Sequence, residues 1–270
     1  MLTRVLCRLL GLTRLDQLLQ QAEAHRGNKS PFASVIDAFK IGARVSVGDF
    51  RRIPREGPVI VVSNHPTGGL EGILVMALLE AVRGDVKTMA HEFFARWPFL
   101  ARRMFLVDIR ESGESNRENA AAMRRAARWV RQRKMLLCLP SANVARFDWR
   151  RRTVVDHPWR PGIVRLARIS KATVLPVHVE AHNSLVFHLL AAIHPRLGAL
   201  VLGRELLAKC SNSFPVRIGR PISAEEIGKM SSEAEITSAL RRAVERLDPA
   251  GAGTDFRKLG ADPEQVAPSS

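Results

Sequence analysis

The sequence predicts an α/β fold in which a largely parallel central sheet is covered by helices, with an N-terminal amphipathic helical region before it. The first observation is the continuous apolar, β-branched run at residues 59–63, which is typical of a strand buried on both faces. Further apolar strands are expected at 135–139 and 173–179, and helical patterns at 118–133 and 162–170 precede them. This alternation of helix and strand predicts a parallel sheet.

The first region, residues 1–45, has leucines at helical spacing between residues 2 and 24, with Arg and Gln between them. Two interpretations of this amphipathic stretch are open. It packs on the rest of the domain, or it lies on a membrane surface with its arginines at anionic headgroups and its leucines at the acyl boundary. A second helix is expected at 31–41.

The second region, residues 46–249, begins with a Pro- and Arg-rich loop and then the strand at 59–63, which ends at Ser63-Asn64-His65-Pro66. An apolar helix follows Gly68 and Gly69. A last short strand starts at residue 216, and a helix runs from about 224 or 232 to 247, since two Ser–Glu pairs have capping-box spacing. Residues 250–270 lack periodicity, which predicts a disordered tail.

The formal net charge is +16, and 34 of the 42 basic residues are Arg. Such a surface favours polyanionic partners: nucleic acid, anionic lipid headgroups, or phosphorylated cofactors and acidic carrier proteins. Nucleic acid is the least favoured of these, because aromatic residues make up only 6% of the chain, Tyr is absent and no zinc-finger spacing occurs.

Cysteine and histidine spacing argues against a metal centre. Cys7, Cys138 and Cys210 form no CxxC pair, so neither a disulfide framework nor a thiolate zinc site is indicated. The histidines show no zinc-binding spacing. No run approaches the roughly 18 uncharged apolar residues of a spanning helix, so we expect any membrane contact to be peripheral.

His65 lies at the predicted carboxyl end of a buried strand, which is where ligands bind in open α/β sheets. Gly68 and Gly69 would let a substrate approach the backbone, and Glu71 falls in the first turn of the next helix. Glu71 could reach back to His65, and a His paired with a carboxylate can act as a general base. On their own, a His and a Glu are more often a turn residue and a helix-start charge.

The wider pattern favours the catalytic interpretation. The segment Asn64-His65-Pro66-Thr67-Gly68-Gly69-Leu70-Glu71 resembles the first motif of the glycerolipid and lysophospholipid acyltransferase superfamily, an Asn-His followed by a carboxylate. The carboxylate sits one position later than is usual, as in a bacterial hemolysin-like branch. Blocks at 105–110, 139–146 and 174–179 resemble the second, third and fourth motifs in the same order, and the similarity spans about residues 12–227.

This resemblance implies an enzyme that moves a fatty acyl group from acyl-CoA or acyl-carrier protein, used as co-substrate with no bound cofactor and no metal. The acceptor would be a lysophospholipid, a glycerol phosphate or an amino-acid lipid, and the place of action the cytoplasmic face of the inner membrane. His65 would be the general base, oriented by Glu71. Substrate contacts are expected from Asn64, Gly68, Gly69, Arg110, Ser141 and Asn143.

The third motif departs from the family pattern Pro-x-Gly-Glu, since Ala142 and Asn143 stand where Gly and Glu are usual. An amide cannot orient an acceptor as a carboxylate does. This leaves open a lipid-binding or scaffold protein with the same fold and impaired chemistry. A hydrolase using Ser141 is a further alternative, but that serine lacks the glycine-flanked elbow.

Overall fold

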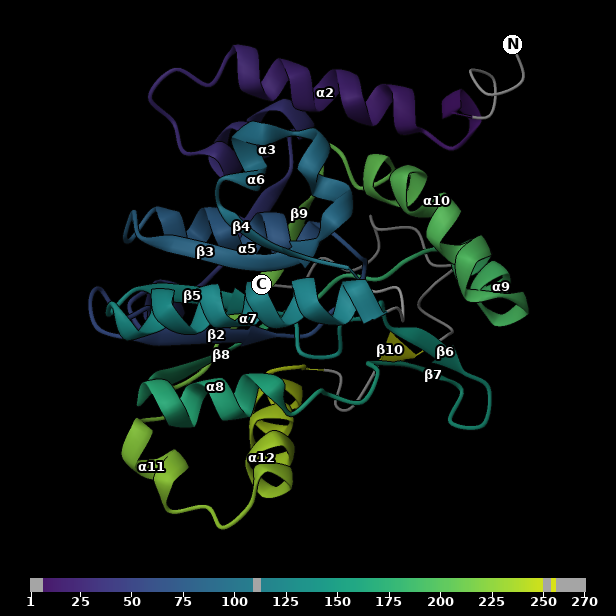
Figure 1. The fold of residues 1–270 in the computed structure, drawn as a ribbon. Coiled ribbons are helices and arrows are strands. Elements are labelled where there is room, and N and C mark those ends of the chain that lie inside the picture. Colours follow the sequence, from purple (N-terminus) through teal and green to yellow (C-terminus); the bar gives the residue numbers. More distant parts are fainter. Residues whose placement is uncertain (1–6, 109–112, 250–253, 256–270) are drawn as a thin grey trace.

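The computed structural model describes residues 7–108, 113–249 and 254–255 (Figure 1). Its centre is a seven-stranded sheet in the order β1-β9-β8-β2-β5-β3-β4. All neighbouring pairs are parallel except β8 and β9, which are antiparallel. This confirms the predicted α/β fold with a largely parallel sheet. The strands are β1 (Gly42–Arg44), β2 (Val59–Ser63), β3 (Val86–His91), β4 (Met104–Val107), β5 (Met135–Cys138), β8 (Thr173–Val179) and β9 (Ser213–Ile218).

Strand β2 lies between β8 and β5, and its side chains alternate between two hydrophobic cores. Val59 and Val61 belong to the core on one face of the sheet. Ile60 and Val62 belong to the core on the other face. All four are essentially inaccessible to solvent, which is why this strand has an unbroken apolar sequence instead of a polar alternation.

Helices cover both faces of the sheet. The first core contains residues of α2 (Leu12–Ala24), α3 (Pro31–Phe39), α5 (Leu70–Glu80) and α6 (Pro98–Ala101). The second contains residues of α7 (Gly113–Arg131), α8 (Gly162–Ser170), α11 (Ala224–Gly228) and α12 (Glu233–Glu245). The remaining short elements near the sheet are α4 (Val47–Phe50) and the 3-10 helix η1 (Glu92–Arg96).

The N-terminal helix packs on the domain over its described length. Helix α2 begins after Gly11, whose φ of 74° interrupts the amphipathic helical region predicted between residues 2 and 24. Leu15, Leu18, Leu19 and Ala22 are buried, and they pack in the same core as α3 and α5. The apolar face of α2 is therefore used inside the protein, which favours the packed interpretation for residues 12–24.

The C-terminal helical region divides into two helices, because both candidate caps are used. Ser223 and Glu226 form a reciprocal capping box at α11, and Ser232 accepts a hydrogen bond from the Glu235 N–H at α12. The predicted disordered tail, 250–270, lies outside the described residues apart from β10 (Thr254–Asp255).

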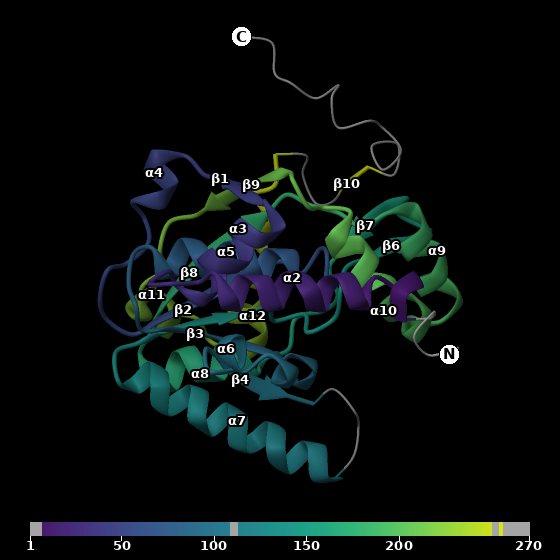
Figure 2. The same cartoon turned by 90° about the horizontal axis from the view of Figure 1, so that it is seen from above.

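A helical hairpin and a small sheet complete the fold. The hairpin consists of α9 (Leu185–Ile193) and α10 (Pro195–Leu207). The small antiparallel sheet consists of β6 (Arg146–Asp148), β7 (Thr153–Val155) and β10. Figures 1 and 2 both show α9 and α10 beside β6 and β7 at one end of the molecule, and α9 packs against β6. No helix within the described ranges is long and apolar enough to cross a bilayer.

Candidate functional site

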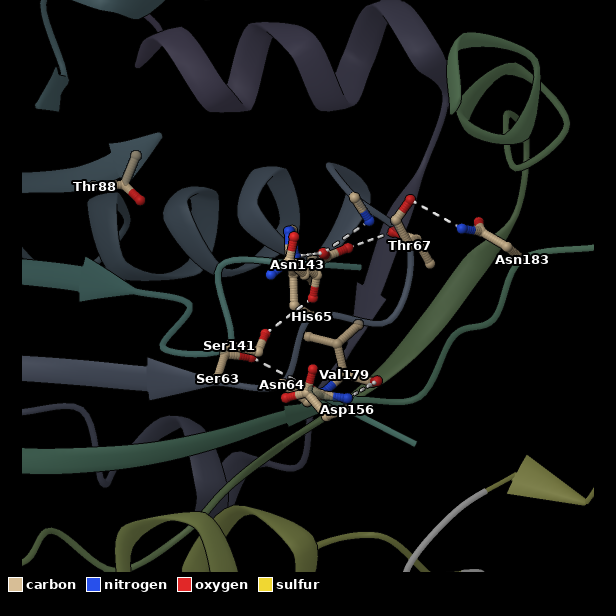
Figure 3. A network of polar contacts seen from close by, with 12 residues as sticks. Ser63, Asn64, His65, Thr67, Thr88, Ser141, Asn143, Asp156, Val179 and Asn183 are labelled. Carbon is tan, nitrogen blue, oxygen red and sulfur yellow. Dashed lines mark hydrogen bonds and ion pairs between the residues drawn. The ribbon is translucent and has the colours of Figure 1, made fainter. Parts of the chain in front are cut away.

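The site is built on the turn that follows β2, and Asn64 holds this turn against β8. The Asn64 amide donates to the Val179 carbonyl oxygen at 3.0 Å and accepts from the Val179 N–H at 2.9 Å (Figure 3). The Asn64 side chain thus continues the hydrogen bonding between β2 and β8 beyond their last backbone pair, Ser63 and Val177. Because these bonds occupy its amide, the structure shows Asn64 as a positioning residue, and a contact from Asn64 to substrate stays a prediction.

The structure brings His65 and Glu71 into direct contact, as the six-residue spacing predicts. His65 Nδ1 bonds to Glu71 Oε1, and the Thr67 hydroxyl donates to Glu71 Oε2. The Gly68 N–H also donates to Glu71 Oε1, at 3.1 Å. The Glu71 side chain is completely buried in the first turn of α5. Three donors therefore fix the carboxylate, and the carboxylate fixes the ring of His65.

This pairing changes the protonation of both groups. Burial disfavours the charged form of His65, but the charge of Glu71 and its hydrogen bond outweigh this effect, so the pKa of His65 is raised above its usual 6.5. Burial also opposes ionisation of Glu71, yet His65 and Thr67 lower the Glu71 pKa to about 2. The carboxylate stays ionised at neutral pH and stabilises an imidazolium next to it.

The second ring nitrogen of His65, Nε2, makes no hydrogen bond to any described residue. His65 lines a pocket of about 70 Å³ together with Asp156, Trp159 and Val179. With Nδ1 held by Glu71, Nε2 is the atom that can take a proton from a bound molecule.

Asp156 is a second carboxylate near His65, and no sequence pattern identifies it. It follows β7, a strand that no pattern predicts, and its Oδ2 accepts a hydrogen bond from Trp159 Nε1 at 3.0 Å. Burial raises the pKa of Asp156, while Trp159, Ser141 and His65 oppose that shift. Ionised Asp156 also contributes to the raised pKa of His65.

The two glycines of the turn differ in their surroundings. A Cβ on Gly68 would lie 2.9 Å from Val144 Cγ2 and 3.1 Å from Leu202 Cδ2, and the φ of Gly68 is +89°. Side chains therefore already occupy the space that we expected a substrate to use there. A Cβ on Gly69 would meet nothing within 4 Å, so the open approach to the backbone is at Gly69.

The loop of the third motif lies against the turn that carries His65. The Ala145 N–H donates to the His65 carbonyl oxygen at 2.8 Å. Ser141 is buried, and its hydroxyl donates to the Asn143 carbonyl oxygen at 3.1 Å, which shapes the loop. Asn143 is half-buried. Their substrate contacts stay predictions, and Arg110, from the second motif, lies outside the described residues.

A buried polar network connects the turn to the α9–α10 hairpin. The Asn183 amide donates to the Thr67 carbonyl oxygen at 3.2 Å, and Lys209 Nζ donates to Asn183 Oδ1 at 2.9 Å. Lys209 also pairs with Glu205, which accepts from the backbone and hydroxyl of Ser184. Thr67, Asn183 and Lys209 are far apart in the chain, so spacing alone does not relate them.

This arrangement can perform general base chemistry: a fixed, ionised carboxylate orients a histidine whose free nitrogen lines a pocket. In the described part of the chain, no group of three or more His, Cys, Asp or Glu side chains could hold a metal ion. The absence of a metal and of a bound cofactor stays a prediction.

Comparison with known proteins assigns the chemistry. A family model described as Acyltransferase matches residues 31–252, which contain the whole site. The chain belongs to the acyltransferase family. The resemblance that the Asn64-His65 segment and the three later blocks indicate is thereby confirmed, and so is the enzyme class.

Two similar proteins are lyso-glycine lipid O-acyltransferases. The protein from Phocaeicola vulgatus is 23% identical over 214 residues, covering 77% of this acyltransferase and 74% of its relative. The protein from Bacteroides thetaiotaomicron is 25% identical over 215 residues, covering 77% and 76%.

Among solved structures, the fold is similar to that of the 1-acyl-sn-glycerophosphate (LPA) acyltransferase PlsC from Thermotoga maritima, with a TM-score of 0.50 and 15% sequence identity. The similarity covers 86% of this chain and 77% of PlsC. At this identity the match supports the fold.

Proposed function

We propose that this acyltransferase moves a fatty acyl group from an acyl thioester, acyl-CoA or acyl-carrier protein, to the hydroxyl of a lysolipid. His65 is the general base and Glu71 orients it. The observation that carries the proposal is the buried His65–Glu71 pair, in which Nδ1 is fixed and Nε2 has no hydrogen-bond partner among the described residues. The two named relatives, both O-acyltransferases of a lyso-glycine lipid, support a lysolipid acceptor.

In the proposed reaction, His65 Nε2 takes the proton of the acceptor hydroxyl as its oxygen attacks the thioester carbonyl carbon. The new C–O bond forms and the C–S bond breaks. The thiolate leaves and takes the proton back from the imidazolium, so the products are an ester and a free thiol. Glu71 stabilises the imidazolium while it exists.

The developing oxyanion needs donors near the carbonyl oxygen. The Gly68 N–H is not available, since it donates to Glu71. We assign this role to the N–H of Gly69, at the N-terminus of α5, where no side chain covers the backbone. The helix dipole favours negative charge at this end of α5.

The basic charge of the chain supports the second part of the proposal, peripheral association with an anionic membrane at its cytoplasmic face. A net charge of +16 attracts anionic lipid headgroups, acyl-CoA and acidic carrier proteins through the same electrostatic force.

Thiol release tests the proposal. The purified chain is mixed with acyl-CoA or with acyl-carrier protein, and with a lysophospholipid, glycerol phosphate or a lyso-amino-acid lipid as acceptor. We expect thiol release that depends on the acceptor and that His65→Ala abolishes. His25→Ala, at an exposed position at the end of α2, is the matched control and should keep the parent rate. A scaffold protein would release no thiol with any acceptor, and that result would overturn the assignment.

A further inference from the structure

The α9–α10 hairpin has large apolar side chains on its outer face as well as on its inner face. On the inner side, Phe187, Ala191 and Gly198 are buried, and a Cβ on Gly198 would lie 2.7 Å from the Ala191 Cβ, so the two helices touch closely. On the outer side, Ile193 is 74% exposed and Val186 is 60% exposed. A helix on the surface of a soluble protein normally has a polar outer face.

We define the hairpin patch as the six exposed large apolar side chains of these two helices: Leu185, Val186, Leu189, Ile193, Leu197 and Leu200. Isolated exposed leucines are ordinary, but six exposed large apolar side chains on two helices that pack together indicate an interaction surface. The patch lies next to the candidate site, since Leu202 of α10 lies over Gly68 and Asn183, just before α9, bonds to Thr67.

The exposed charged side chains of α9 and α10 are all positive, and the acidic residue on neighbouring β6, Asp148, lies 3.7 Å from Arg151. No acidic residue occurs from position 185 to 204, while Arg196 and Arg204 are exposed on α10. The turn between β6 and β7, beside α9, presents exposed Trp149 followed by three exposed arginines at 150–152. Apolar side chains with an exposed Trp and a basic rim are the combination that suits a bilayer interface, where apolar groups enter the acyl boundary and arginines meet headgroups.

We infer that the hairpin patch, together with the β6–β7 turn, docks this acyltransferase on an anionic lipid bilayer and presents the His65 site to it. This inference deepens the proposed function, on which it rests for the choice of a lipid partner. A symmetric contact with a second copy fits less well, because it would bring the same arginines of both copies together. A nucleic acid would satisfy the arginines and leave the apolar side chains exposed.

The proposed membrane contact lies away from the N-terminal helix, whose apolar face between Leu12 and Ala24 is buried in the protein core. In both views the hairpin and the β6–β7 turn lie at the same end of the molecule. Figure 2 shows α4 at the opposite side. The position of α4 makes it a suitable place for control substitutions.

Sedimentation with lipid vesicles tests the docking surface. The parent chain should bind vesicles containing phosphatidylglycerol, weakly bind pure phosphatidylcholine, and lose affinity as salt rises. The double variant Ile193→Glu/Leu200→Glu should reduce binding at least about tenfold, since two exposed apolar groups no longer enter the lipid. Arg150→Gln and Arg151→Gln should each cost about fivefold.

The matched control is Val47→Glu/Ile169→Glu, which introduces the same charges at two exposed apolar positions, 68% and 53% exposed, on α4 and α8. This control should bind vesicles like the parent. Equal binding by the hairpin variant and the parent, or equal losses in the hairpin and control variants, would overturn the inference. So would a hairpin variant that binds vesicles normally and instead converts a dimer to a monomer.

A second measurement needs no destabilising substitution. Brominated phosphatidylglycerol should quench part of the Trp fluorescence of the parent, and Trp149→Phe should remove that quenched part, because the other three tryptophans are buried or half-buried. Unchanged quenching in Trp149→Phe contradicts the inference. His65→Ala should bind vesicles like the parent while losing acyl transfer. A parent chain that binds vesicles but transfers no acyl group to any acceptor refutes the proposed function and leaves the docking surface standing.

Discussion

Replacing Glu71 with Gln removes one charge from the site and keeps its shape. The amide oxygen of Gln can accept from His65 Nδ1 and from the Gly68 N–H, and its NH₂ group can donate to the Thr67 hydroxyl, which can reverse its role. Folding should therefore be little affected. The charge-assisted bond to His65 becomes a neutral one, and the imidazolium loses its buried counter-charge.

We expect this loss to cost about 3 kcal/mol of transition-state stabilisation, from the difference between charged and neutral hydrogen bonds and the lost ion pair. This corresponds to about a 100-fold lower kcat/KM, since each 1.36 kcal/mol changes a rate tenfold.

The pH profile gives an independent signature. His65 must be neutral to accept a proton, so kcat/KM of the parent should rise with pH through the pKa of His65, which Glu71 holds above 6.5. In Glu71→Gln this acidic limb should move to lower pH, while the plateau falls.

The assay is acyl transfer from pH 5 to 9, with thermal unfolding as the folding check. Glu80→Gln is the matched control, because Glu80 is a buried carboxylate at the other end of the same helix and has no contact with His65. A Glu71→Gln variant that keeps its turnover within about threefold of the parent, with an unshifted limb, would refute the reasoning.

Three further predictions concern the surroundings of the pair. Asp156→Asn should shift the acidic limb of kcat/KM slightly to lower pH, because ionised Asp156 contributes to the raised pKa of His65; a shift to higher pH would contradict this. Gly68→Ala should lower the free energy of unfolding by about 2–3 kcal/mol, because Gly68 has a φ of +89° and an added Cβ would clash with Val144. Its control is Gly72→Ala, in open space on α5, which should raise the free energy of unfolding by up to about 1 kcal/mol. Denaturant titration measures both. Lys209→Met should lower the free energy of unfolding by about 3 kcal/mol, since buried Glu205 loses its cation. An unchanged free energy of unfolding in the same titration would count against a structural role for the Lys209–Glu205 pair.

The sequence determined the elements whose residues carry a local signal. The strand at 59–63 and the strand at 173–179 are β2 and β8, and helix 162–170 is α8, because unbroken apolar runs and helical periodicity are local properties. The pairing of His65 with Glu71 was also predictable, since a turn and one helical turn bring residues six apart together. Strand β3 mixes Lys87, Thr88 and His91 with apolar residues, and β4 at the sheet edge is only four residues long, so no pattern identified either as a strand.

Only the tertiary structure decided which groups surround that pair. Asp156 follows β7, Asn183 directly precedes α9 and Lys209 follows α10, and the chain between them is too long for spacing to relate them. Tertiary packing also decided which apolar faces are used. The leucines of α2 and those of α9–α10 look alike in sequence. The first set is buried in the core beside α3 and the second is exposed, because a hydrophobic pattern specifies the apolar face of a helix but not what covers that face.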